Sequence, residues 1–446
     1  MKDILNKTQL VDYFSEGAKK RNQWRIGSEY ENLLFDLSNY KSVPYSGKKS
    51  ILAIFSELIK NKWKPVKEGK NILSLIKNKK SITLEPGLQF ELSGDAVKNI
   101  HQTCSEVGTY IQELKIVCEN LGIGLLSNGF APTARLNQIF KSPKKRYEIM
   151  RKYMPRVGNN GLDMMHRTCA TQVNLDYSNE KDYIKKTKLI ATITPVAVAL
   201  FSNSPFKEKK LNNFLSYRTH IWQNTDKNRS GIPSFFLDES NSFERYVDFA
   251  LEVPMYFIIK NNQYINCAGE NFGDFIKGNL KNLKNKKATL QDWENHISTI
   301  FTELRLKKYL EIRSADSCSS SGICSVPAFW TGLLYNEQAL EKGLEYVKNW
   351  KYSEVYNAYL EVPKKGFNTL LKNKKIYEHA KILVKFSAFG LKNRKQIDNK
   401  GNDESIFLKD IYQFLDNKQS PAQRLISKYK SEWKKDIFKI FDEEAF

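Results

Sequence analysis

The chain has 446 residues, which suffices for two or three average domains or for one large domain with a helical extension. Its 41% hydrophobic and 12% aromatic residues exclude a disordered or fibrous protein. The formal net charge of +22 would suit nucleic-acid binding if Lys and Arg were clustered. The lysines are instead spread along the chain, mostly beside Asn in polar segments. We interpret them as a solvated surface whose positive field also favours anionic substrates such as ATP.

The cysteines and the apolar segments exclude further classes of protein. The six cysteines show no paired zinc-ligand spacing and no Cys-x-x-Cys, so we expect no zinc site. The N-terminal segment lacks the apolar core of a secretion signal, which leads us to expect a cytoplasmic protein. The longest apolar run, residues 189–201, is too short to span a bilayer and contains Pro195. It predicts a buried helix and no membrane partner.

The first part of the chain alternates between helical and strand patterns. Residues 11–20 and 51–60 have the period of short amphipathic helices, and residues 25–36 between them predict a strand. After a second strand, apolar residues at spacings of three and four predict a helix over 97–121, closed by Gly122.

A third strand is predicted at residues 169–177, and the pattern becomes mainly helical after residue 335. The other elements that we expect are a hairpin of residues 253–259 and 263–267, an exposed loop at 277–287, a polar linker at 392–404 and a final amphipathic helix at 421–441.

Acidic and amide side chains interrupt the predicted strands. Because side chains two apart on a strand share a face, three pairs should each emerge on one face: Glu29 with Glu31, Gln89 with Glu91, and Glu311 with Arg313. Glu85 precedes a Pro-Gly bend that would turn it towards the same site, and the third strand adds Gln172 and Asn174. Carboxylates gathered on one exposed face need cations to neutralise them. The pattern therefore predicts a site for magnesium and phosphate.

Common catalytic signatures are absent from the sequence. It contains no Gly-x-Ser-x-Gly, no His-Glu-x-x-His and no Gly-x-Gly-x-x-Gly, and no complete phosphate loop. If the chain binds ATP, magnesium ions on the strand carboxylates would hold the phosphates. An arginine would then compensate the charge that develops during phosphoryl transfer.

Several charged residues allow two interpretations. Arg218 either contacts a small polar ligand or stacks on the tryptophan four residues later as structural support. In the segment before the third strand, we expect Arg167 in a pocket and Met164 in the core. Glu303 and Arg305 repeat the two-residue spacing, and we interpret them as a structural ion pair.

Specific segments occur along nearly the whole chain. The clearest are Arg25 to Glu31, Ser81 to Gly94, His101 to Cys104, Arg151 to Pro155, Gly161 to Met165, Arg167 to Asp176, Phe201 to Phe206, Arg218 to Trp222, Asp248 to Tyr256, Asp292 to His296, Leu304 to Arg313 and Ser420 to Leu425. Their sequences and their order resemble glutamate–cysteine ligases of the plant and proteobacterial type.

The resemblance implies an α+β fold similar to that of glutamine synthetase: a curved, largely antiparallel sheet flanked by helices, with a mainly helical C-terminal part. The polar linker leads us to expect a catalytic domain over residues 1–391, and the linker with a C-terminal helical extension packed on that domain over 392–446, with a single domain as the alternative. The implied reaction joins the γ-carboxylate of L-glutamate to the amine of L-cysteine with ATP, through γ-glutamyl phosphate, in the first step of glutathione synthesis. The implied cofactor is Mg²⁺, with Mn²⁺ as an alternative. The expected assembly is a monomer or homodimer without nucleic acid.

The resemblance also implies roles for individual residues. The metal ligands of the family correspond to Glu29, Glu31, Glu85, Glu91 and Glu311. Arg313 corresponds to the residue that stabilises the transferring phosphoryl group. Contacts to ATP or substrate are implied for Gln89, Arg167, Gln172, Asn174 and Arg218. A redox-sensitive pair is implied for Cys104 and Cys324, although Cys104 on its apolar stripe also fits a buried, inert thiol.

The sequence departs from the family at two places, and two alternatives stay open. Leu88 replaces an expected glycine after the Pro-Gly bend, and residues 316–324 replace a bulky, basic segment, so contacts in that loop are not carried over. Nothing local identifies a thiol pocket, so a ligase that joins glutamate to a different amine is the first alternative. A basic nucleic-acid-binding protein is the second, but it leaves the carboxylate strands unexplained.

Overall fold

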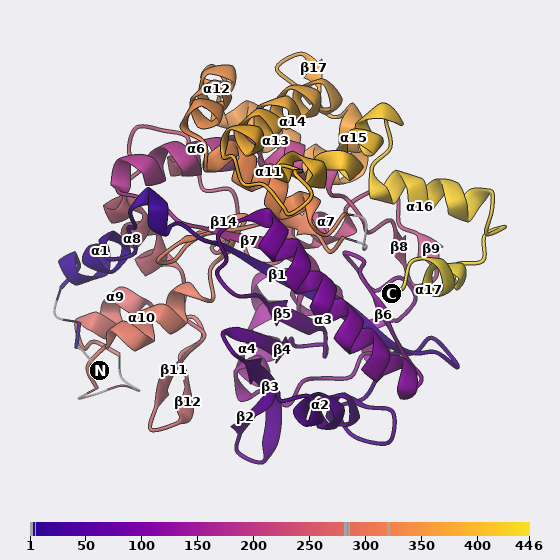
Figure 1. Cartoon of the computed structure of the whole chain (residues 1–446). Coiled ribbons are helices and arrows are strands. Elements are labelled where there is room, and N and C mark those ends of the chain that lie inside the picture. Colours follow the sequence, from indigo (N-terminus) through magenta and orange to yellow (C-terminus); the bar gives the residue numbers. More distant parts are fainter. Residues whose placement is uncertain (1–2, 5, 281–282, 284–285, 319–321) are drawn as a thin grey trace.

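The computed structural model describes residues 3–4, 6–280, 283, 286–318 and 322–446. Its centre is a nine-stranded sheet of antiparallel strand pairs with helices on its flanks (Figure 1), which confirms the expected fold class. The strand order is β14-β15-β7-β1-β5-β4-β3-β2, and β6 also pairs with β1. The bounds are β1 Ile26–Asp36, β2 Lys64–Glu68, β3 Asn71–Lys77, β4 Lys80–Leu84, β5 Phe90–Ser93, β6 Ile123–Leu126, β7 Ala170–Leu175, β14 Leu304–Leu306 and β15 Leu310–Asp316.

Helices and short hairpins connect and cover these strands. The helices are α1 Thr8–Ser15, α2 Ile51–Lys60, α3 Ile100–Asn120, α4 Lys145–Val157, α5 Gly161–Arg167, α6 Glu180–Leu200, α7 Tyr217–Gln223, α8 Phe243–Glu252, α9 Phe272–Ile276, α10 Leu290–Ile297, α11 Ser325–Leu334, α12 Glu337–Val347, α13 Tyr352–Lys365, α14 Ile376–Asn393, α15 Lys409–Asp416, α16 Pro421–Lys430 and α17 Lys439–Glu443. The short strands are β8 Phe206–Lys207, β9 Lys210–Leu211, β10 Ser230–Gly231, β11 Phe257–Lys260, β12 Gln263–Asn266, β13 Phe301–Thr302, β16 Leu370–Leu371 and β17 Lys374–Lys375.

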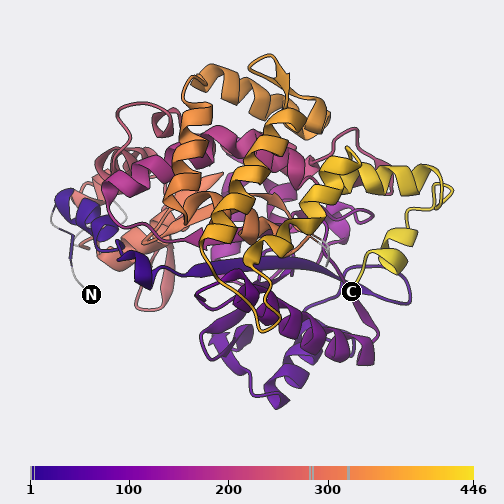
Figure 2. The ribbon, with the colours of Figure 1, turned by 45° about the horizontal axis from the view of Figure 1, so that its top comes forward.

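Helices α11 to α14 and α6 form a layer against the sheet. Figure 2 shows its orange members together on one side of the molecule. α11 packs on β7 and α14, and α6 packs on β15. The predicted buried helix is confirmed, because every residue of α6 from Leu189 to Leu200 is buried. None of the helices that the structure describes has the length and apolar character needed to cross a bilayer.

Strand β1 lies in the middle of the sheet and sets the positions of the acidic side chains. It pairs with β5 on one side and with β7 on the other. Its burial alternates, so Tyr30 lies in the core while Glu29 and Glu31 face the other way. The register places Glu29 beside Gln172 and Glu31 beside Glu91. Side chains far apart in the sequence are thereby gathered on one face.

The predicted final helix is wrong in one respect, since it consists of two helices. α16 ends at Lys430, and α17 begins only at Lys439. Between them the backbone passes through positive φ at Lys434 and Lys435, a conformation that an α-helix cannot contain. Trp433 is nevertheless buried, so the apolar pattern predicted the packing and not the break.

Other local predictions had mixed outcomes. The helix at 51–60 is confirmed as α2 and the hairpin as β11 and β12, whereas the helix predicted at 11–20 ends at Ser15. Residues 281–282 and 284–285 of the predicted exposed loop lie outside the described residues. Within the same loop Leu280 and Leu283 are buried, so it is not wholly exposed.

A disulfide joins two distant parts of the chain. It links Cys104 on α3 to Cys324, immediately before α11, across 220 positions of sequence. It therefore ties the helix beside β1 to the helical layer. The redox sensitivity of this bond stays a prediction.

Candidate active site

A cavity of about 570 Å³ opens on the face of the sheet that carries the acidic side chains. Its walls come from β1, β5, β7, β14 and β15 and from α4, α5 and α7. The volume is within the range of small-molecule sites. The predicted site residues that line it are Glu29, Glu31, Glu85, Gln89, Glu91, Gln172, Asn174, Arg218 and Arg313. Residues chosen from separate strands thus meet in one place.

Four carboxylates in this cavity are held by protein donors. Glu29 accepts a hydrogen bond from Asn174 Nδ2 (2.9 Å), Glu31 from the N–H of Ala170 (2.6 Å), Glu85 from Tyr147 Oη (3.2 Å) and Glu91 from Ser93 Oγ (3.1 Å). Glu91 also accepts a hydrogen bond from Thr83 Oγ1 (3.3 Å), and each of the four carboxylates keeps lone pairs that these bonds do not use. The oxygens are therefore oriented but not saturated.

The crowding of these carboxylates changes their acidity. Burial, followed by the charge of Glu85, raises the pKa of Glu31 to about 8. Burial also lifts the pKa of Glu91 well above its usual value, with Glu85, Glu29 and Glu31 adding to the effect. The pKa of Glu29 is raised by burial and then by Glu311. The cavity therefore favours a bound cation, which would stabilise the ionised forms.

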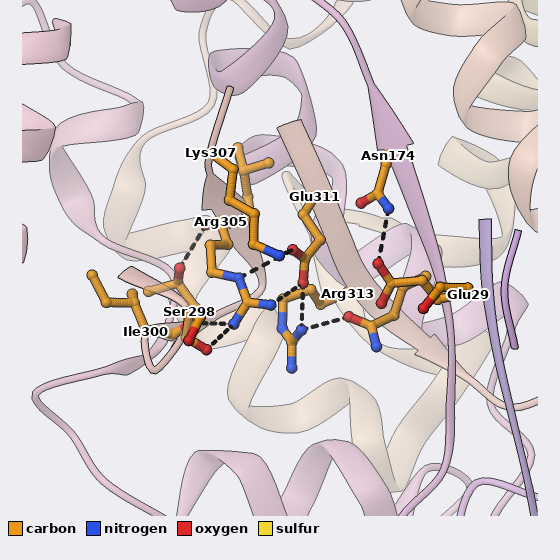
Figure 3. Close-up of polar contacts among 12 residues, drawn as sticks. Glu29, Asn174, Ser298, Ile300, Arg305, Lys307, Glu311 and Arg313 are labelled. Atoms are coloured by element: carbon orange, nitrogen blue, oxygen red, sulfur yellow. Dashed lines mark hydrogen bonds and ion pairs between the residues drawn. The ribbon is translucent and has the colours of Figure 1, made fainter. Parts of the chain in front are cut away.

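Glu311 has a different environment. It is fully buried and pairs with Arg305, with Lys307 at 2.7 Å and with Arg313 at 2.7 Å (Figure 3). Burial alone would raise its pKa, but the three cations together hold the pKa of Glu311 well below its usual range. Glu311 is thus an ionised centre around which three cations of the site are arranged.

The predicted ion pair between Glu303 and Arg305 is wrong. Glu303 accepts a hydrogen bond from Tyr359 Oη at 2.6 Å, and Arg305 pairs with Glu311. The cause is the register of β14 and β15, which places Arg305 directly opposite Glu311. Cross-strand neighbours of this kind are closer than side chains two positions apart on one strand.

The donor chemistry of the cavity fits magnesium in part. Carboxylate oxygens are preferred magnesium ligands, and Glu29, Glu31, Glu85 and Glu91 supply them. Among the residues that the structure describes, no group of three His, Cys, Asp or Glu side chains is arranged to hold a metal ion by itself. A magnesium ion here would need further oxygen ligands from water or from substrate phosphates. The metal role of Glu311 stays a prediction, because it requires the three ion pairs to rearrange.

A tight turn between β4 and β5 carries Glu85 into the site. The N–H of Leu88 donates to the carbonyl of Glu85, and the N–H of Glu85 donates to the carbonyl of Gln89, both at 3.0 Å. Leu88 has a φ of 63°, in the left-handed region that favours glycine. The departure from the family at this position therefore leaves the turn in place, and the buried Leu88 side chain packs in the core beneath it.

The amide side chains orient charged groups. Gln89 donates to the carbonyls of Met165 (3.2 Å) and Thr168 (3.0 Å), so it fastens the turn to α5 and the residue after it. Gln172 accepts a hydrogen bond from Arg313 Nη1, and Asn174 donates to Glu29. Their predicted contacts with ATP or substrate stay predictions.

Arg218 makes the tryptophan contact considered from the sequence, and its contact with a ligand stays a prediction. Its Nη2 donates to the carbonyl of Arg313 at 2.9 Å, and its guanidinium lies 5.9 Å from the ring centroid of Trp222. Within the described ranges, Nη1 of Arg218 is buried without a hydrogen-bond partner. A buried, unpaired donor in a ligand cavity is suited to an anionic group of a ligand.

Arg167 is not among the residues that line the cavity, and its expected contact with ATP or substrate stays a prediction. Its buried guanidinium pairs with Asp163 (2.6 Å) and Glu208 (3.0 Å) and donates to the carbonyl of Ala134 (3.0 Å). Its donors are thus engaged inside the protein. Met164 is buried in an apolar cluster, as expected, and it also lines the cavity.

Six cations of the cavity were not predicted as site residues from the sequence. They are Lys19, Arg25, Lys144, Arg146, Arg305 and Lys307. Lys144 and Arg146 lie at the start of α4, where cations oppose the helix dipole, and this unfavourable placement was a usable signal. Burial lowers the pKa of Lys144, while Glu85 and Glu91 oppose that shift. Arg305 and Lys307 gave no comparable local signal.

Comparison with known proteins extends over the whole chain. Glutamate–cysteine ligase A, chloroplastic, of Oryza sativa subsp. indica is 43% identical over 443 residues, which cover 99% of this chain and 88% of the relative. Glutamate–cysteine ligase, chloroplastic, of Nicotiana tabacum is 43% identical over 439 residues, covering 98% and 83%. A crystal structure of the glutamate–cysteine ligase of Francisella tularensis in complex with AMP has a TM-score of 0.55 at 13% identity, covering 94% of this chain and 87% of that one, and shows the shared fold.

The expectation of a cytoplasmic protein is contradicted, because these plant relatives are named chloroplastic. The expectation rested on the lack of a secretion signal. That feature tests only for export, and it does not distinguish among the compartments of a protein that is not secreted.

The family model described as glutamate–cysteine ligase family 2 matches residues 25–443, a range that includes every strand and helix lining the cavity. With this match and the identity of the plant relatives over almost the whole length, the chain belongs to glutamate–cysteine ligase family 2.

Proposed function

We propose that this protein joins the γ-carboxylate of L-glutamate to the amine of L-cysteine with ATP, giving γ-glutamylcysteine, ADP and phosphate in the first step of glutathione synthesis. The observation that carries the proposal is the 43% identity to a glutamate–cysteine ligase over 99% of the chain. The cavity agrees with it, because acidic side chains and arginines face one another there, as phosphoryl transfer between carboxylate and nucleotide requires.

The chemistry proceeds in two displacements. An oxygen of the glutamate γ-carboxylate attacks the γ-phosphorus of ATP, and the bond to ADP breaks as γ-glutamyl phosphate forms. The cysteine nitrogen then attacks the acyl carbon, and phosphate leaves with the electron pair of the carbon–oxygen bond while the nitrogen loses a proton. Holding both partners in one cavity adds an effective molarity of about 10⁵ M or more.

The arginines of the site match the charges in this reaction. We assign Arg313 to the transferring phosphoryl group, because it is fixed between Glu311 and Gln172 at the cavity wall. We assign Arg218 to a carboxylate of the amino-acid substrate, because its unpaired Nη1 can bind one. Gln89, Gln172 and Asn174 orient these groups and are proposed as weaker ligand contacts.

We propose that Glu29, Glu31, Glu85 and Glu91 hold Mg²⁺, with Mn²⁺ as the alternative and Glu311 as a further candidate ligand. When bound, the ion would neutralise phosphate charge and bridge the nucleotide to the sheet. The raised pKa values of Glu31 and Glu91 support a cation at this place, since burial and then the neighbouring carboxylates disfavour their ionised forms, which a cation would stabilise.

The test is ADP release by the reduced protein with magnesium and ATP, given glutamate, cysteine, both, or glutamate with other amines, with products identified by mass. Release that requires both amino acids, with γ-glutamylcysteine formed, supports the proposal. Preference for another amine would keep the chemistry and change the acceptor. If no amino acid stimulates release and the protein binds DNA or RNA with strong salt dependence, the nucleic-acid alternative replaces the ligase.

We also propose that residues 1–391 form the catalytic domain and that 392–446 are an extension packed on it. The support is a shared apolar cluster, in which Leu425 and Trp433 of the extension are buried with Leu126 and Phe206. The expectation of a monomer or homodimer stays a prediction that light scattering would measure.

A further inference from the structure

One buried carboxylate fastens the end of β15 to helix α7. Asp316 is 1% exposed. Its Oδ2 accepts hydrogen bonds from the N–H of Asn203 (2.8 Å) and from Ser204 Oγ (2.7 Å), and its Oδ1 accepts one from Ser216 Oγ (2.8 Å). A Cβ at position 129 would lie 2.5 Å from the Cγ of Asp316, so Gly129 leaves the room that this carboxylate occupies. A buried charge with three donors is rigidly oriented.

Both serines pass this orientation on to α7. Ser204 Oγ accepts a hydrogen bond from the N–H of Arg218 at 3.1 Å. Ser216 is the N-cap of α7, and its Oγ accepts from the N–H of Thr219 at 3.1 Å. A hydroxyl that donates its single proton to a carboxylate turns its lone pairs towards other donors. Asp316 therefore orients both hydroxyls so that their lone pairs face the first N–H groups of α7.

Helix α7 carries two residues of the cavity wall, Arg218 and Trp222. The strand that ends at Asp316 also carries Arg313, whose carbonyl accepts a hydrogen bond from Arg218 Nη2 at 2.9 Å. Helix α7 and strand β15 are thus joined at two points. One is the side chain of Arg218, and the other is the pair of serine hydroxyls between Asp316 and the first N–H groups of α7. Arg218 lines the cavity, and Asp316 does not.

We propose that Asp316 is a positioning residue for the amino-acid substrate: by holding the start of α7, it fixes the place from which the Arg218 guanidinium meets a substrate carboxylate. This inference rests on the proposed function for its kinetic consequence. Loss of Asp316 should weaken the use of glutamate, because Arg218 moves, and should leave the use of ATP unchanged.

The first measurement needs no turnover. Amide hydrogen exchange of the free protein is compared between the wild type and Asp316→Ala. We expect exchange at residues 218 and 219 to accelerate by about tenfold, because both amides lose oriented acceptors. Asp316→Asn should restore slow exchange, since its Oδ1 can still accept from Asn203 and Ser204 while its Nδ2 donates to Ser216. Unchanged exchange in Asp316→Ala would overturn the inference, even if the protein is not a ligase.

The second measurement separates the substrates. In Asp316→Ala we expect the KM for glutamate to rise about tenfold or more, and the KM for ATP to stay within about twofold. Asp316→Asn should return the glutamate KM to within about threefold of the wild type. Equal increases for both substrates, or a fall in kcat alone, would show a general disturbance and refute the positioning role. A wild type without ligase activity would refute the proposed function and leave the exchange result to decide on the anchor.

A matched pair of cap variants covers the case in which Asp316→Ala does not fold. Ser216→Ala removes the N-cap of α7 together with its bond to Asp316. Ser242→Ala removes an equivalent cap on α8, where Ser242 Oγ accepts from the N–H of Arg245 at 3.0 Å. None of the described cavity-lining residues comes from α8. We expect only Ser216→Ala to raise the glutamate KM, by about threefold or more, and equal behaviour of the two variants would refute the inference.

Discussion

Replacement of Arg313 by alanine removes a guanidinium that is fixed between two partners. Its Nη1 donates to Glu311 at 2.7 Å and also to the side-chain amide oxygen Oε1 of Gln172. The change has two separable effects. A donor for the transferring phosphoryl group is lost, which lowers turnover, and Glu311 loses one of three cations, which lowers stability.

The two effects differ in size. Loss of one preorganised donor lowers kcat by about 10² to 10³, or about 3–4 kcal/mol. The side-chain oxygen Oε1 of Gln172, left without this donor, costs about 1–3 kcal/mol of stability. Glu311 keeps Arg305 and Lys307, so the loss stays below the roughly 3–5 kcal/mol of a buried charge left alone. We therefore expect a folded variant with at least about a hundredfold lower turnover.

The assay is ADP release at saturating glutamate, cysteine and magnesium-ATP, together with thermal unfolding. Arg394→Ala is a matched control, because Arg394 donates at 2.7 Å to the fully buried Glu404 and is not among the described residues of the cavity wall. We expect the control to lose stability and to keep its turnover. Near-wild-type turnover in folded Arg313→Ala would remove Arg313 from the mechanism. A proportional loss of turnover and stability in both variants would show that the effect is structural.

Three further outcomes follow from the site, the disulfide and a buried histidine. Removal of magnesium with a chelator should abolish ADP release, and Glu31→Gln should raise the magnesium concentration for half-activation by about tenfold; an unchanged magnesium titration would exclude Glu31 as a ligand. Reduction of the Cys104–Cys324 bond should lower the free energy of unfolding by up to about 5 kcal/mol, because the bond closes a long loop, and Cys104→Ser should not respond to reductant in the same melting experiment. Burial lowers the pKa of His296 from 6.5 to about 4, so the unfolded chain takes up the proton first as the pH falls. The free energy of unfolding should therefore decrease between pH 6.5 and pH 4 by at most about 3 kcal/mol. Denaturant titrations of His296→Gln should show a smaller decrease over this range. An equal decrease in the variant would show that the histidine titrates normally.

The alternation of side chains along each strand was enough to predict many of the residues that line the cavity. Alternation alone placed Glu29 with Glu31 on one face, and the same rule placed Gln172 and Asn174 on one face of β7. These predictions succeed because the face of a side chain on a strand depends only on its parity. The order of the strands, which brings β7 beside β1, was not predicted from the sequence.

Contacts across strands and helices could not be read in the same way. The pairing of Arg305 with Glu311 depends on the register between β14 and β15, which no local period encodes. The direction of Arg167 depends on its acidic partners, Asp163 one helical turn earlier and Glu208 on a distant hairpin. The break between α16 and α17 depends on how the chain reverses to bury Trp433. Each of these features is decided by tertiary packing.

The order of strands in the sheet also bears on synthesis of the protein. β1 leaves the ribosome early, but its neighbour β7 follows only at residue 170, and β15, which carries Glu311 and Arg313, is complete only at residue 316. Until then a nascent chain exposes one edge of β1 and then of β7, and long-range pairing of this kind forms slowly. A polypeptide interrupted before β15 would carry the carboxylates of β1 and β5 without Glu311 and Arg313. Such a fragment would lack the arginine that we assign to the transferring phosphoryl group, so premature termination would give an inactive product and not a weakened enzyme.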